Sequence, residues 1–347
     1  MGEHFGKIKK DSVIKVYNTV LDRVRSTRTE LSSLTGLSYV TVSKICDGLL
    51  SLDILKQSFT TDRSAIRRSR VISVKSKYWI GIYTFEPELF TFNICDLSLR
   101  IIHTFNYIPA NDIFVDDTVN RFIKCAENFA KQKARNRICC GTGILVPGEY
   151  NYESDTVQAS SIPHFNSIYL KKLFQGKTFD TLPTISSLYT SYSREIQKTL
   201  EKEDKILALY LNKGDLKCTY FDNHTSNNIH LNNMGILPCG DNSKKSLNVL
   251  CETPPDPSIL FPRLADIIFT LMNTVKITKV TLNGNLYTRM DAAESVLKNN
   301  LHLICDQYSI IPPNINTINV RAYAIKNIAR EIRNIWFTEK ILEEDSL

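Results

Sequence analysis

The sequence lacks the features that mark membrane-spanning, secreted and disulfide-stabilised proteins. No apolar run approaches the ~20 residues that a helix needs to cross a bilayer. The opening stretch MGEHFGKIKKDS holds no apolar segment of the kind found in a secretory signal. Nine cysteines occur among 347 residues, and none forms a CxxC pair. We therefore expect a cytoplasmic protein with no membrane partner, whose cysteines are reduced thiols.

Positive charge is distributed unevenly along the chain. The net charge is +7, yet residues 1–77 carry 15 Lys and Arg against seven Asp and Glu, whereas the remaining 270 residues carry 28 against 29. The whole positive surplus therefore lies in the first fifth of the sequence. Such a distribution is typical of a nucleic-acid-binding module attached to a neutral domain, although a basic face that only improves solubility would give the same balance.

The N-terminal region predicts two short helices separated by a short linker. The stretch DSVIKVYNTVLDRV spaces its apolar residues as one face of a helix does. A second helix is expected in STRTELSSL, where Thr27 and Glu30 match a capping box and Leu31 and Leu34 form a stripe that should face inward. A glycine at position 36 follows and favours a sharp turn.

A third helix is expected to begin after Ser38, with Val42, Ile45 and Leu49 on its buried side. The second helix, the turn and the third helix together match a helix-turn-helix, which places the start of its last helix in the DNA major groove. Outward positions on this helix are Tyr39, Val40, Ser43, Lys44 and Asp47. Hydroxyl and ammonium groups can bond to base edges, and a valine can meet a thymine methyl. The residues that we expect to contact DNA here are Arg28, Ser38, Tyr39, Val40, Thr41, Ser43 and Lys44.

The following segment, DILKQSFTTDRSAIRRSRVISVKSKYW, predicts a two-stranded wing. Its tip and return strand carry arginines that suit backbone phosphates or a narrow minor groove. These are Arg63, Arg67, Arg68 and Arg70. We therefore predict a winged helix-turn-helix over residues 1–77 that binds double-stranded DNA. The alternative is a unit of the same shape that serves only dimerisation or peptide docking.

From Tyr78 onward the sequence changes to short β-rich runs. Three such runs, from KYWIGIYTFE to RIIHTFNYI, precede a helical stretch and the strand-like ICCGTGILVPG. The same order recurs from KILALYLNKG to KVTLNGNL. This repetition predicts an internally duplicated α/β domain with two lobes and a ligand cleft between them.

We expect this domain to span residues 78–347, with one lobe over about 78–200 and the other over about 201–347. Near the end of the chain, NVRAYAIKNIAREIRNIWF has the pattern of an amphipathic helix. Its Ala and Ile stripe is expected to pack on the second lobe, and a dimer contact is the alternative.

Several segments together resemble those of one known family. They are RTELSSLTGLSYVTVSKICDGLLSLDIL, KYWIGIYTF, FNICDLSLRII and GILVPG, with weaker matches in IPHFNSIYLKKLF and VTLNGNL. The resemblance covers nearly the whole chain and is to the ROK family of sugar-responsive repressors and sugar kinases. It implies a winged helix-turn-helix followed by a two-lobed actin-like, ribonuclease H-like domain. It also implies a homodimer or higher homo-oligomer, and a sugar or phosphosugar as effector.

The sequence departs from the kinases of that family at the residues that catalysis needs. Such a kinase uses glycine-rich hairpins to hold ATP phosphates and a carboxylate to accept the proton of the sugar hydroxyl. Here Tyr83 stands where the family has an Asp, and the second phosphate loop keeps only Gly214. Ser187 or Tyr189 occupies the place of the catalytic Asp, and neither can act as that base. We therefore expect no catalytic residues and no enzymatic activity, with a carbohydrate kinase bearing a DNA-binding arm as the alternative.

The sugar-binding and zinc-binding element of the family is also altered. The matching stretch, NMGILPC, places Asn233 at the position of a Glu and Ile236 at that of a zinc-binding His. The thiols that follow, Cys239 and Cys251, are too far apart in sequence to resemble a zinc loop. We expect no metal and no cofactor. The resemblance leaves Ser187 and Asn233 as candidate effector-binding residues, in a domain that binds an altered effector or only dimerises.

Overall fold

The computed structural model describes most of the chain. The described residues are 5, 8–59, 69–109, 115–158, 160, 162, 164–175, 183–188, 196, 205–212, 215–222, 229–230, 257–284, 293–317 and 320–343. Within these residues, no helix combines the length and the apolar character that crossing a membrane requires.

The first part of the chain folds into three helices and a two-stranded antiparallel sheet, which we call the N-terminal unit. Its elements are α1 (Lys10–Arg23), α2 (Arg28–Thr35), α3 (Tyr39–Ser51), β1 (Leu55–Phe59) and β2 (Arg70–Val74). The predicted capping box is confirmed, because Thr27 Oγ1 accepts from the Glu30 amide at 3.2 Å and the Glu30 carboxylate accepts from the Thr27 amide at 2.7 Å. Gly36 ends α2 with a φ of 68°, the left-handed conformation that glycine tolerates best.

The predicted inward position of Leu34 is wrong, since this side chain is 47% exposed. The neighbouring Thr35 is buried in its place and donates a hydrogen bond from Oγ1 to the Leu31 carbonyl at 2.6 Å. The apolar spacing of α2 predicted a buried face but misplaced its edge by one residue, because a hydroxyl bonded back to its own helix can be buried at little cost.

The chain then forms a five-stranded sheet with the order β5–β4–β3–β6–β9. Its strands are β3 (Tyr78–Glu86), β4 (Leu89–Cys95), β5 (Ile101–Tyr107), β6 (Ile138–Val146) and β9 (Thr184–Ser187). Neighbours in β5–β4–β3 are antiparallel, whereas β3–β6 and β6–β9 are parallel. Between β6 and β9 lie β7 (Glu149–Asn151), β8 (Thr156–Gln158), the short helix η1 (Phe165–Ser167) and α5 (Leu170–Phe174). We call this sheet and the helices on it lobe one.

A second five-stranded sheet has the order β12–β11–β10–β13–β14. Its strands are β10 (Lys205–Asn212), β11 (Asp215–Asp222), β12 (Ile229–His230), β13 (Lys279–Asn283) and β14 (Asn314–Thr317). Strand directions repeat those of the first sheet, with three antiparallel strands and then two parallel ones. The predicted duplication is therefore confirmed. We call this second sheet and its helices lobe two.

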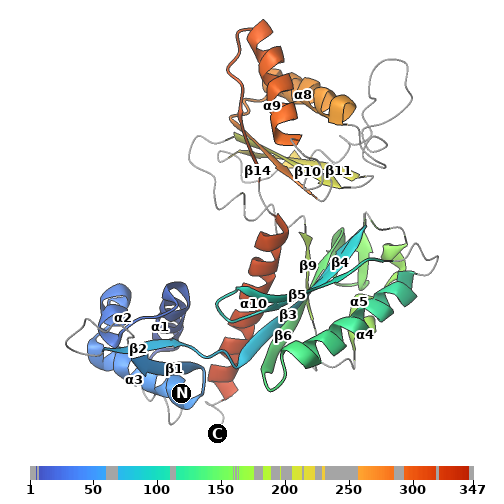
Figure 1. The fold of residues 1–347 in the computed structure, drawn as a ribbon. Coiled ribbons are helices and arrows are strands. Elements are labelled where there is room, and N and C mark those ends of the chain that lie inside the picture. The colour runs from blue at the N-terminus through green and yellow to red at the C-terminus, as the bar shows by residue number, and fades with distance from the viewer. Residues whose placement is uncertain are drawn as a thin grey trace.

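Different helices cover the two sheets. In lobe one, α4 (Val115–Lys133) places Phe122 against an aromatic cluster, with its ring centroid 5.5–5.8 Å from those of Tyr83, Phe85 and Phe90. In lobe two, α8 (Pro257–Thr274) and α9 (Ala293–Gln307) pack together on one side of the sheet (Figure 1). Each lobe thus has its own apolar core.

The last helix, α10 (Val320–Glu343), does not pack on lobe two, so that prediction is wrong. It runs along the lobe one sheet, against β6, β3 and β9, and ends beside the N-terminal unit (Figure 1). Its 24 residues span roughly 36 Å. The sequence pattern showed that one face of α10 is apolar, but an apolar stripe does not specify which of two similar sheets it covers.

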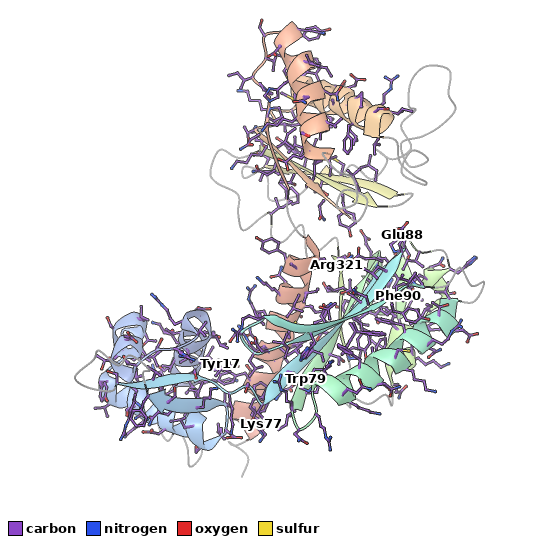
Figure 2. All side chains as sticks on the ribbon, in the orientation of Figure 1. Tyr17, Lys77, Trp79, Glu88, Phe90 and Arg321 are labelled. Carbon is purple, nitrogen blue, oxygen red and sulfur yellow. The ribbon has the colours of Figure 1, made fainter. Side chains whose placement is uncertain are left out.

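The end of α10 joins the N-terminal unit to lobe one through buried aromatic contacts. The ring of Phe337 stacks on that of Tyr17 in α1, with centroids 3.6 Å apart and planes 11° from parallel. Trp336 packs on Tyr78, the first residue of β3, at 4.8 Å. Figure 2 shows Tyr17 on the side of the N-terminal unit that faces α10. A single hydrophobic core consequently runs from α1 and α3 through α10 into the sheet.

Gly143 in β6 allows α10 to approach the sheet closely. A Cβ atom at this position would lie 2.8 Å from Cδ1 and 2.9 Å from Cγ1 of Ile328 on α10. We expect Gly143→Ala to lower the free energy of unfolding by about 1–2 kcal/mol, because overpacking outweighs the entropic gain of replacing a strand glycine. Urea denaturation of the full chain measures this change.

The matched control removes the atoms of Ile328 that the new methyl group would meet. Ile328→Ala deletes both Cδ1 and Cγ1, so Gly143→Ala should cost less in that background than in the wild-type chain. If the effects of the two substitutions add, the close approach of α10 to Gly143 is not what makes a glycine necessary there.

Candidate nucleic-acid interface

Helix α3 buries one face and presents the other to solvent. Val42, Ile45 and Leu49 are fully buried, as predicted. Tyr39 and Val40 on the opposite side are 53% and 63% exposed, although both are large and apolar. We call the residues on this side the outward face of α3; they are Ser38, Tyr39, Val40, Thr41, Ser43, Lys44 and Asp47, of which Thr41 and Ser43 are partly buried.

The start of α3 is capped by side chains of this outward face. Ser38 Oγ accepts from the Thr41 amide at 3.2 Å and lies 2.9 Å from the Thr41 hydroxyl. The cap satisfies one of the free N–H groups of the first turn, and such turns favour negatively charged ligands. The outward face therefore combines a helix start, hydroxyl groups, one ammonium group at Lys44 and exposed apolar surface.

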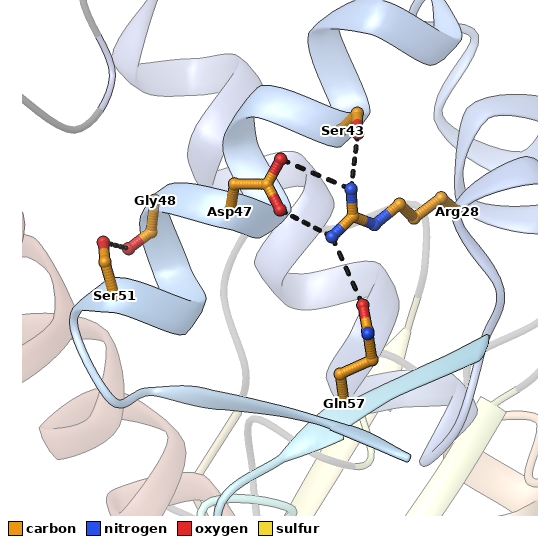
Figure 3. A network of polar contacts seen from close by, with 6 residues as sticks. All are labelled: Arg28, Ser43, Asp47, Gly48, Ser51 and Gln57. Atoms are coloured by element: carbon orange, nitrogen blue, oxygen red, sulfur yellow. Dashed lines mark hydrogen bonds and ion pairs between the residues drawn. The ribbon is translucent and has the colours of Figure 1, made fainter. Parts of the chain in front are cut away.

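Arg28, the first residue of α2, reaches across to α3 and β1 (Figure 3). Its Nη2 donates to Asp47 Oδ1 at 2.6 Å, and its Nη1 donates to Asp47 Oδ2 at 3.3 Å. The same Nη1 donates to Ser43 Oγ at 2.5 Å, and Nη2 donates to Gln57 Oε1 on β1 at 3.4 Å. Two predicted DNA-contacting residues, Arg28 and Ser43, are thus bonded to each other.

This network neutralises the one carboxylate on the outward face of α3. An unpaired Asp47 would repel DNA phosphates, and the bidentate Arg28 contact offsets its charge. The side chain of Arg28 is 20% exposed while that of Asp47 is 60% exposed, so the guanidinium is the better shielded partner. Sequence reasoning placed Asp47 outward but missed the contacts of Arg28 with Asp47 and Gln57, because these two residues lie 19 and 29 positions from Arg28 in the sequence.

The sheet of the N-terminal unit is antiparallel, with Phe59 paired to Arg70 at its outer end. A bridge from Ser26 to Ile72, with bonds of 3.0 and 2.7 Å, ties it to the α1–α2 linker. Arg70 is exposed, as a phosphate contact requires. The predicted contacts Arg63, Arg67 and Arg68 lie outside the described residues.

Two further cations near this sheet are occupied within the unit. Lys75 and Lys77 both donate to the carboxylate of Asp53, the latter at 3.0 Å. These hydrogen bonds lower the pKa of Asp53 below its ordinary value. The two lysines therefore fix the connection from β2 to β3. Exposed cations of the unit include Lys44 on α3, Lys56 on β1 and Arg70 on β2.

The hairpin of lobe one, where a kinase of this type would hold phosphates, is built differently here. Tyr83 points into the aromatic core, with ring centroids 4.6 Å from Phe92 and 4.9 Å from Phe174. Burial raises its pKa above the ordinary range of a tyrosine. At the end of β3, Glu86 is buried and pairs with Arg321 of α10 at 2.5 Å.

Of the two candidate effector residues, the structure describes only Ser187. Ser187 is the last residue of β9, pairs with Val146 of β6 and is only 6% exposed. Asn233 lies outside the described residues, as do Tyr189, Gly214, Ile236, Cys239 and Cys251. Among the side chains that the structure describes, no three His, Cys, Asp or Glu residues gather closely enough to hold a metal ion.

No protein-family model matches the chain, and no curated protein matches its sequence. Solved structures do match. A ROK family transcriptional regulator, described as a homolog of the E. coli Mlc protein, superposes with a TM-score of 0.59 at 15% identity over 95% of this chain and 100% of its own. The Lmo2764 protein from Listeria monocytogenes, a candidate N-acetylmannosamine kinase, gives 0.52 at 13% identity, over 74% of this chain and 99% of its own. A ROK family protein from Streptococcus pneumoniae TIGR4 in complex with sucrose gives 0.50 at 9% identity, over 76% and 99%.

These likenesses differ in how much of the chain they cover. The match to the regulator spans 95% of the chain and so must extend into the N-terminal unit, whereas those to the other two leave about a quarter of it uncovered. At such low identity a likeness shows the fold alone. The chain has a mixed α/β fold of the kind found in ROK family regulators and sugar kinases.

Proposed function

We propose that the protein is a sequence-specific DNA-binding transcriptional regulator, and that residues 1–77 form its winged helix-turn-helix. The observation that carries the proposal is the outward face of α3, where Tyr39 and Val40 are 53% and 63% exposed beside Lys44 and several hydroxyls. Exposed apolar side chains beside hydroxyls and a cation, at the start of the last helix of a helix-turn-helix, suit contact with base edges. The positive surplus of residues 1–77 makes a polyanion the natural partner.

In the proposed mechanism, a homodimer places two copies of α3 in successive major grooves of a palindromic operator. The two-lobed domain holds the dimer and sets the distance between the copies. Repression is the expected outcome, because it follows from occupancy of the operator alone. The resemblance to ROK regulators supports this arrangement.

An effector, if it is a sugar or phosphosugar, must bind one arrangement of the domains more tightly than another. Helix α10 is the element that supports such coupling, because it contacts lobe one along its length and the N-terminal unit at its end. Its first turn is bound to the lobe one hairpin through Arg321 and Glu86, and Figure 2 shows Arg321 at the opposite end of the helix from the Tyr17 contact.

Substitutions on α3 and on the wing should affect DNA binding in different ways. We expect Tyr39→Ala and Lys44→Ala to weaken binding to a selected operator by about tenfold while changing binding to unrelated DNA little. The double substitution of Arg67 and Arg68 by Ala should weaken binding to all DNA and lower the salt slope by about one unit per lost phosphate contact. Fluorescence anisotropy over a range of salt concentrations measures both effects.

A matched control for these variants is Lys298→Ala, which removes an exposed cation from α9, far in sequence from the N-terminal unit. It should leave operator affinity and salt slope unchanged. Wild-type affinity in both the α3 and the wing variants would overturn the assignment of residues 1–77 as the DNA-binding domain.

Lack of kinase activity is the second expectation. Tyr83 is buried in an aromatic core and Glu86 is buried and paired with Arg321, so neither side chain is available to act on a bound phosphate or sugar. A coupled assay over a panel of hexoses and amino sugars should show ATP consumption at the background of the heat-denatured protein. Sugar-dependent turnover by the native protein would instead support a carbohydrate kinase with a DNA-binding arm.

A further inference from the structure

Ser43 is the residue of α3 whose hydrogen-bonding role is most narrowly fixed. It lies between Tyr39 and Asp47 on one line of the helix, since residues four apart share a face. Arg28 Nη1 lies 2.5 Å from its hydroxyl oxygen. A guanidinium has only N–H donors and no acceptor, so the serine oxygen must be the acceptor of this bond.

The hydroxyl proton of Ser43 is left for another partner. Hydroxyls within helices often donate back to a carbonyl of the preceding turn, as Thr35 does to Leu31 at 2.6 Å and Ser51 does to Gly48 at 2.7 Å (Figure 3). Within the described part of the chain, Ser43 makes no such bond as a donor. With one lone pair held by Arg28, its proton is directed away from the guanidinium.

The guanidinium itself is fixed from two sides. Asp47 holds it with both oxygens, and Gln57 accepts from it at 3.4 Å on the side of β1. These contacts come from α3 and from the neighbouring sheet, so the orientation of Arg28 depends on the packing of the whole unit rather than on one flexible side chain. Arg28 is therefore placed to orient Ser43, and its role as a direct DNA contact stays a prediction.

We propose that Arg28 makes Ser43 a hydrogen-bond donor toward DNA, so that α3 requires an acceptor at the base that Ser43 faces and disfavours cytosine there. This inference rests on the proposed function. In the major groove both purines present N7, guanine also presents O6 and thymine presents O4, whereas cytosine presents only the N4 amino donor. The pairing of Asp47 with Arg28 matters for the same reason. A free carboxylate one turn further along α3 would accept a hydrogen bond from the N4 amino group of cytosine and so favour cytosine.

The test uses the full-length protein and an operator obtained by selection from randomised DNA. Each purine of the operator is replaced singly by its 7-deaza analogue, which removes the N7 acceptor, and each guanine and thymine by 6-thioguanine or 4-thiothymine, whose sulfur is a much weaker acceptor than O6 or O4. At one position in each half-site, the analogue should weaken wild-type binding about fivefold to tenfold, the range of one net hydrogen bond. The same position should disfavour cytosine.

Two variants separate the role of Ser43 from that of its positioning residue. Ser43→Ala should lose the response to the analogue at that position and keep the responses elsewhere. Arg28→Leu should lose the same response and accept cytosine there, because it frees both the serine oxygen and Asp47. Arg70→Ala is the matched control: it should weaken binding uniformly and retain the response.

Thermal unfolding shows whether each variant remains folded. Arg28→Lys provides a second, more conservative variant that keeps the charge but not the bidentate contact.

The outcomes distinguish this inference from the proposed function. If the protein selects an operator but Ser43→Ala and Arg28→Leu keep the wild-type base preferences, the donor role is wrong and the function stands. If no sequence is enriched from the randomised pool, both the proposed function and the donor role are wrong.

Discussion

The contact between the end of α10 and α1 determines how the parts of this protein are arranged. Phe337 stacks on Tyr17 at 3.6 Å, and both rings are almost completely buried. The core around them includes residues of α3, β2 and the lobe one sheet. Because aromatic side chains bury a large area and their contacts are geometrically specific, the N-terminal unit is held against lobe one in a defined orientation.

Several other features depend on this contact. Gly143 lets α10 lie close to the lobe one sheet, and the first turn of α10 is anchored by the buried Glu86. On the far side of the unit, the buried face of α3 shares the same core, which leaves Tyr39 and Val40 directed outward. Packing within the molecule and exposure of the candidate DNA-binding face are thus two consequences of one arrangement.

Local features of the sequence predicted local structure well. The capping box at Thr27 and Glu30, the turn at Gly36 and the repeated succession of strands and helices in the two lobes were all predictable, because each depends on short runs of residues. Longer-range features were not. The Arg28–Asp47 pair joins two helices, and α10 covers the sheet of the other lobe, so neither is encoded in a periodic pattern. Arg63, Arg67, Arg68 and Asn233 remain sequence predictions.

The central claim, that α3 and the adjacent sheet contact DNA while α10 keeps the unit attached to lobe one, is tested most directly by hydrogen–deuterium exchange. The full-length protein is compared with and without saturating operator DNA. We predict slower exchange over residues 39–44, 55–59 and 70–74, with exchange in α1 and the second half of α10 unchanged. Protection confined to the two lobes, with α3 exchanging as in the free protein, would contradict the account.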